Sequence, residues 1–153
     1  MELERATAET YVRHAFTQML EVADRLGDEL VNARPLGPDT NAVAALVIHC
    51  CELTEFWLGH VGLGRTTHRD RESEFTSTAT VAELRARLDA TVRQTTNDLE
   101  LIAAGKTQAD RGGWQFLLES DESDGALVLH VLEELYQHLG HMEITADALL
   151  HRP

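Results

Sequence analysis

The sequence has few of the residues that stabilise small or extracellular proteins covalently. Its only two cysteines, Cys50 and Cys51, are adjacent, which is poor geometry for a disulfide, and they fall within a helical pattern. We interpret them as reduced thiols in or near the core. A chain of 153 residues is long enough to bury a hydrophobic core without disulfides or a structural metal. We therefore expect the chain to fold without a disulfide or a bound metal.

Basic residues and long apolar runs are also scarce. Thirteen Lys and Arg against 26 Asp and Glu give a formal net charge of −13, which repels phosphate groups. We therefore expect neither nucleic acid nor an anionic membrane surface as a partner. No apolar run approaches the roughly 18 residues of a membrane span, and the first residues lack the pattern of a signal segment. We expect residues 1–153 to form one cytoplasmic domain.

Hydrophobic periodicity predicts four helices. Apolar residues recur at three- and four-residue intervals over residues 7–31, the pattern of an amphipathic helix. The second helix, over 41–61, is apolar on most of its circumference. Asp39 or Thr40 is placed to accept hydrogen bonds from the first amides of that helix.

The third and fourth helices have clear start signals. The stretch 80–83, Thr-Val-Ala-Glu, matches a capping box that begins the third helix, and Gly105 ends it. Ser123 or Asp124 caps the last helix, which runs almost to the C-terminus. Between them, the apolar patch 114–118 is expected to form a strand-like segment or a helical turn packed over one end of the bundle.

The connection between the second and third helices is unusually long. Residues 62–79 show no periodicity and are rich in Gly, Thr, Ser and charged residues. Such a segment can return along the bundle, so that the second and third helices run parallel. The sequence therefore predicts an all-α protein, a four-helix bundle with a long crossover between its second and third helices.

The last helix has four potential metal ligands on one stripe. At 100° per residue, His130, Glu134, His138 and His141 lie within roughly 80° of one another. Glu134 and His138 are at the edge of the apolar stripe or inside it, whereas His130 and His141 are expected further out. A carboxylate and an imidazole at positions i and i+4 are close enough to bind one divalent ion.

His49 is the candidate for a third ligand. It lies on the densest apolar face of the second helix, so we expect it to be buried and to need a partner for each ring nitrogen. A carbonyl group or a metal could satisfy it. If the second and fourth helices are neighbours, His49 meets Glu134 and His138. Three protein ligands leave positions open for water or substrate, as in catalytic sites. Zinc is our first choice, with nickel, iron and manganese as alternatives.

Other residues could assist such a site. Glu133 and His141 are candidates for proton transfer or for supporting the ligands. The crossover carries several of the few basic groups, and these are either solvated or line the mouth of a pocket. In the second case Arg65 and His68 would contact an anionic substrate or cosubstrate.

These residues together are similar to a known family. The pattern Glu134-x-x-x-His138-x-Gly-His141, with His49 eight residues before Trp57, resembles the DinB-like superfamily of four-helix metalloenzymes. The closer likeness is to mycothiol S-transferases and the N-terminal domain of mycothiol-dependent maleylpyruvate isomerases. This resemblance implies a zinc site of His49, Glu134 and His138, mycothiol or a similar thiol as cosubstrate, and a homodimer.

The sequence departs from the family's motifs at two positions. Family members often have an acidic residue five positions after the histidine of the second helix, where this chain has Thr54. They also commonly have an arginine after the Gly-His pair of the last helix, and none follows His141 here.

Three functions follow as hypotheses. The first is a metal-dependent transferase that activates a low-molecular-weight thiol for attack on a small electrophile. The second is a metal-dependent hydrolase. The third is a non-catalytic, stress-related binding module.

Overall fold

The computed structural model describes residues 3–109 and 123–151, and these ranges form helices and loops without a strand. The helices are α1 (Arg5–Leu30), α2 (Val43–Thr54), the π-helix η1 (Glu55–Gly62), α3 (Arg71–Glu74), α4 (Val81–Ala103) and α5 (Asp124–Leu150). The predicted all-α class is confirmed. None of the described helices combines the length and the apolar character that a membrane span requires.

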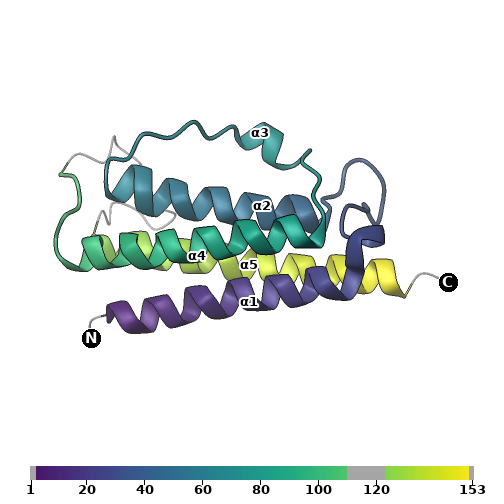
Figure 1. The fold of residues 1–153 in the computed structure, drawn as a ribbon, viewed down its shortest axis with the longest axis horizontal. Coiled ribbons are helices and arrows are strands. Elements are labelled where there is room, and N and C mark those ends of the chain that lie inside the picture. The colour runs from purple at the N-terminus through teal and green to yellow at the C-terminus, as the bar shows by residue number, and fades with distance from the viewer. Residues whose placement is uncertain (1–2, 110–122, 152–153) are drawn as a thin grey trace.

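The long helices form a bundle with two parallel pairs. α1 packs against α4 and α5, and α2 packs against the same two helices. As Figure 1 shows, α1 and α5 run in one direction, whereas α2 and α4 run in the other. The crossover, which includes α3, returns along the outside of α2 and thereby allows α2 and α4 to run parallel (Figure 1). This topology confirms the predicted crossover.

The core follows the apolar stripes of the sequence. Its largest fully buried side chains come from α1, α2, η1, α4 and α5, and include Phe16, Met19, Leu46, Leu58, Leu84, Leu135 and Met142. Cys50 and Cys51 are fully buried and form no disulfide, as expected for reduced core thiols. The apolar sides of α2 and α5 thus bring the predicted ligand-bearing helices together.

The start of α2 differs from the prediction. Its N-cap is Ala42, and no side chain among the described residues caps it, so neither Asp39 nor Thr40 does so. The Thr40 hydroxyl instead donates to the Gly37 carbonyl at 2.9 Å. The guanidinium of Arg34 donates to the Thr40 carbonyl and holds this turn. The Thr40 hydroxyl, which the sequence pattern predicts to cap the helix, is therefore engaged within the preceding turn.

The second helix also changes its winding. Beyond Thr54 it continues as a π-helix over Glu55–Gly62, which the apolar pattern did not predict. The side-chain amide of Gln108 donates to the carbonyls of His60 and Val61, at 3.0 and 2.8 Å. Contacts from a distant part of the chain thus satisfy carbonyl groups in this element, and π-helical turns are frequent at functional sites.

The predicted start signals of the last two long helices are present. Thr80 and Glu83 form both hydrogen bonds of a capping box, and Gly105 follows α4 with a φ of 67°. Ser123 is the cap of α5, with its hydroxyl accepting from the Ala126 amide. The patch 114–118 lies outside the described residues.

Candidate metal centre

His49 projects from the middle of α2 and is buried, as predicted, with 3% of its surface exposed. Its Nδ1 atom lies 2.6 Å from Oε2 of Glu74, a residue of α3. The Phe75 ring packs on the imidazole with a centroid separation of 4.6 Å. A hydrogen bond from Nδ1 to a carboxylate leaves Nε2 as the nitrogen available to a ligand.

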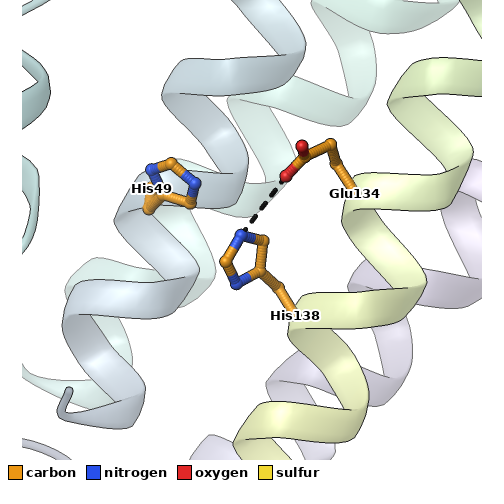
Figure 2. Close-up of side chains that lie close together, drawn as sticks. All are labelled: His49, Glu134 and His138. Carbon is orange, nitrogen blue, oxygen red and sulfur yellow. Dashed lines mark ion pairs between the residues drawn. The ribbon is translucent and has the colours of Figure 1, made fainter. Parts of the chain in front are cut away.

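Glu134 and His138 face His49 from α5. They lie one turn apart and are half-buried, and His138 Nε2 is 3.4 Å from Glu134 Oε2. The three residues each offer a ligand atom, and these atoms all lie within 4.8 Å of one another. Figure 2 shows one nitrogen of His49 turned toward this pair. The structure therefore brings together the three residues that the sequence identified.

The donor set fits a divalent ion such as zinc. Ligand atoms around a tetrahedral zinc ion are separated by about 3.3 Å, given Zn–N distances of about 2.0 Å. The Glu134–His138 pair already has this spacing, at 3.4 Å, and the ligand atom of His49 lies within 4.8 Å of both. Two nitrogens and one carboxylate oxygen suit zinc, nickel, iron and manganese.

The surroundings of both imidazoles favour the neutral form, which is the form that binds a metal. Burial lowers the pKa of His49, an effect partly offset by the hydrogen bond that His49 donates to the Glu74 carboxylate. Burial also lowers the pKa of His138, and the neighbouring His49 adds to this effect. Both rings therefore resist protonation to a lower pH than an exposed histidine does.

Glu74 is a site residue that the sequence analysis missed. Its side chain is 3% exposed, and its two oxygens accept from Nε and Nη2 of Arg69 at 2.6 and 3.1 Å. Asp70 caps the short helix α3 that carries it. The adjacent Phe75 is the one aromatic residue in the polar stretch 62–79, and could have marked the point where the crossover packs on the bundle.

The proposed assisting residues of α5 lie at different distances from the ligands. The His141 ring is exposed and stacks beside His138, with centroids 6.4 Å apart. Glu133 is turned away from the triad, since one oxygen accepts from the Gln137 amide and the other lies 3.7 Å from His130 Nδ1. Of the two, His141 is therefore nearer the candidate metal site.

The prediction that His130 lies further out is wrong. Its side chain is only 8% exposed, and its ring meets the Trp57 ring edge-on at a centroid distance of 4.5 Å. Trp57 belongs to η1, so the packing of the π-helix against α5 covers a histidine that helical periodicity alone places near the surface.

Arg65 and His68 line a surface cavity of about 470 Å³ between the crossover, α2–η1 and α4. Neither belongs to the cluster of three candidate ligands. Arg65 donates to the carboxylate of Asp98, while Arg69, in the same cavity wall, pairs with Glu74. The cavity is therefore connected to the candidate metal centre only through a chain of contacts, in which Arg69 pairs with Glu74 and Glu74 bonds to His49.

Comparisons with known proteins place these residues in a family. Searches of the curated proteins and of the solved structures gave no match. The family model of the DinB superfamily, a metal-binding superfamily, matches residues 11–142, which is most of the chain and includes all three candidate ligands. The helical bundle and the His-Glu-His cluster agree with that match. The chain therefore belongs to the DinB superfamily.

Proposed function

We propose that this protein is a divalent-metal-dependent S-transferase, which uses zinc to activate a low-molecular-weight thiol for attack on a small electrophile. The cluster of His49, Glu134 and His138 carries the proposal. Three protein ligands from two facing helices are typical of catalytic metal sites, where the remaining positions bind water or substrate. The resemblance to mycothiol S-transferases supports a thiol in that position, and mycothiol is our first candidate.

The burial of the three ligands supports an open site. His49 is deeply buried, whereas the side chains of Glu134 and His138 remain 27% and 20% exposed. The cluster is therefore anchored in the core on one side and accessible to small molecules on the other. Structural metal sites, in contrast, usually have all four positions filled by protein ligands.

The proposed reaction joins a thiol sulfur to an electrophilic carbon. A bound divalent ion would stabilise the thiolate and so supply a nucleophile at neutral pH. A bond then forms between sulfur and carbon, while the bond from carbon to its leaving group breaks and the electron pair departs with that group. The thiol proton passes to a base, and we assign this role to His141, whose exposed ring lies beside His138.

Neighbouring side chains and helix geometry orient the three candidate ligands. Glu74 holds the ring of His49 through Nδ1, which fixes the ring and directs Nε2 toward the two ligands on α5. The i and i+4 spacing on one rigid helix sets Glu134 relative to His138. The metal set is thus preorganised, which reduces the reorganisation needed when an ion binds.

The first experiment measures metal content. We expect untagged protein to retain about one equivalent of zinc after exposure and desalting, by plasma mass spectrometry, because three ligands converge. His49→Ala, Glu134→Ala and His138→Ala should each abolish tight binding, whereas His14→Ala, on an exposed position of α1, should not. Equal metal retention in His49→Ala and the parent protein would contradict the site.

The second experiment identifies the reaction. We expect zinc-loaded protein to accelerate alkylation of mycothiol by a chromogenic electrophile, and His138→Ala to lose this acceleration. Turnover of ester or amide substrates without added thiol would instead identify a hydrolase, since the same open site can activate water. Metal binding that changes stability but supports neither reaction would identify a non-catalytic binding protein.

A further inference from the structure

The cavity beneath the crossover is separate from the three candidate ligands and has its own set of polar groups. Its volume of about 470 Å³ is within the range of small-molecule sites. Its walls come from three elements, the crossover, α2–η1 and α4. The lining includes Glu52 and Glu55 from α2–η1, Arg65, His68 and Arg69 from the crossover, and Gln94 from α4.

The crossover wall presents two arginines, and a buried acid pairs with each of them. Arg65 donates to Asp98, which is 2% exposed, and Arg69 donates to Glu74, which is 3% exposed. Each guanidinium uses only some of its five donors in these bonds. A Cβ on Gly59 would collide with the Arg65 guanidinium, so the glycine leaves the space that this group occupies. Both arginines therefore stand preoriented, with donors remaining for a further acceptor.

The wall formed by α2–η1 is acidic. Glu52 and Glu55 share a single arginine, Arg87, whose two terminal nitrogens donate to them at 2.7 Å each. Two carboxylates paired with one guanidinium leave an excess negative charge on this side. The Gln94 amide nitrogen donates to Asp98, so its carbonyl oxygen remains as an additional acceptor in the cavity wall.

The cavity also has an apolar aromatic surface. Phe56 lines the cavity, with the Arg69 guanidinium over its ring at 5.2 Å and the His60 ring against it at 5.2 Å. Nδ1 of His60 is bonded to the Arg65 carbonyl at 2.8 Å, so the imidazole is fixed in place. The cavity therefore combines an acidic wall, a wall with free guanidinium donors and an apolar aromatic surface.

We propose that this cavity is a binding site for a small zwitterion, a short peptide or amino-acid conjugate with a free amino group and a free carboxylate. A ligand with only a carboxylate would be repelled by the excess negative charge at Glu52 and Glu55. A ligand with only an ammonium group would leave the remaining guanidinium donors of Arg65 and Arg69 without a ligand acceptor. A molecule with both charges satisfies both walls, with its ammonium group at Glu52 and Glu55 and its carboxylate at Arg65. This site does not depend on the proposed transferase reaction.

The test uses trialanine and its two blocked forms as probes. N-acetyl-trialanine keeps only the carboxylate, and trialanine amide keeps only the ammonium group. We expect calorimetric titration of the full chain to give a Kd for trialanine at least about tenfold lower than for either blocked peptide, because each charge contributes a partly buried, hydrogen-bonded ion pair. Equal affinity for all three peptides, or no saturable binding, would overturn the proposal.

Two variants test which wall binds the ammonium group and which binds the carboxylate. Glu52→Gln should remove the advantage of trialanine over its acetylated form, whereas Asp89→Asn, on the other side of α4, should preserve it. The double variant Arg65→Gln with Asp98→Asn removes both partners of one ion pair and leaves no buried charge unpaired. It should abolish the advantage of trialanine over its amide.

The control for the double variant is Arg85→Gln with Asp24→Asn, which removes an exposed ion pair between α1 and α4. It should leave every Kd unchanged, and an equal loss in this control would overturn the proposal by showing a general charge effect. His138→Ala, which removes a candidate metal ligand, should bind trialanine as the parent does. Retained binding in this variant separates the cavity from the metal centre, and loss would contradict their independence.

Discussion

At the residue scale, the candidate centre depends on contacts behind the ligands as much as on the ligands themselves. Glu74 fixes the ring of His49, and Arg69 in turn fixes Glu74. Carboxylates that hold a metal-binding histidine in this way commonly strengthen metal binding, because they orient the ring and raise the basicity of its free nitrogen. This makes Glu74 a positioning residue, although it offers no ligand atom itself.

Glu74→Gln is expected to weaken zinc binding about 10- to 100-fold, because a neutral amide holds the imidazole less firmly than a carboxylate does. Competition with a chromophoric chelator measures the Kd. Glu72→Gln, an exposed glutamate in the same short helix, is the matched control and should bind zinc normally. An unchanged zinc affinity in Glu74→Gln would show that the hydrogen bond to His49 has no role in metal binding.

The buried thiols give a pH prediction. Burial raises the pKa of Cys51 from 9.0 to about 12 and raises that of Cys50 well above its ordinary value. Between pH 9 and about pH 12, Cys51 loses its proton in the unfolded chain and retains it in the folded chain. The free energy of unfolding therefore falls as pH rises above 9, by about 1.4 kcal/mol per pH unit for one such thiol.

Denaturant unfolding at pH 8 and pH 10 tests this prediction. The loss of stability between the two pH values should be smaller in Cys51→Ala than in the parent, because the variant lacks one thiol that ionises only on unfolding. An identical pH dependence in both proteins would show that Cys51 does not contribute to it.

At the element scale, the starts of the long helices are stabilised in different ways. α4 begins with a complete capping box, whereas the first amides of α2 have no side-chain cap among the described residues. The side chain of Asn32 joins the end of α1 to the crossover, through a donated bond to the Ala79 carbonyl and an accepted bond from the Ala79 amide. These contacts set the direction in which the chain enters α4.

Thr80→Ala is expected to lower the free energy of unfolding by about 1 kcal/mol, because it removes the hydroxyl that accepts from the Glu83 amide. Chemical denaturation measures the change. Thr78→Ala, two residues earlier and also exposed, lacks this capping role and should change stability by less than about 0.5 kcal/mol. An equal loss in both variants would mean that the cap does not stabilise α4.

At the scale of the whole molecule, the candidate metal centre connects three segments. His49 comes from α2, Glu134 and His138 come from α5, and Glu74 attaches the crossover to His49. A ligand that binds only the folded state stabilises all of these contacts together. The homodimer, the cytoplasmic location and the thiol cosubstrate remain predictions at this scale.

Zinc is expected to raise the Tm of the protein, and a zinc concentration of 100 times its Kd corresponds to about 2.7 kcal/mol of stabilisation. Hydrogen exchange should slow in 70–79 as well as in α2 and α5, because the crossover is anchored to a metal ligand. His138→Ala should show neither change on addition of zinc. Slower exchange confined to α2 and α5 would contradict the coupling through Glu74.

The sequence by itself determined the features that depend on local periodicity and spacing. Apolar repeats predicted the long helices, and Thr80 with Glu83 marked the start of one of them. Glu134 and His138 are one turn apart on a helix, so their proximity follows from helical geometry alone. The burial of His49 followed from the apolar face on which it lies.

The tertiary structure decided the features that depend on distant contacts. Glu74 stands 25 residues from His49, and nothing in the local pattern of the crossover assigns it to the imidazole. The burial of His130 requires Trp57 from η1, and the cavity requires three elements to converge. Periodicity specifies which face of a helix is apolar, but only packing specifies which side chain of another segment covers that face.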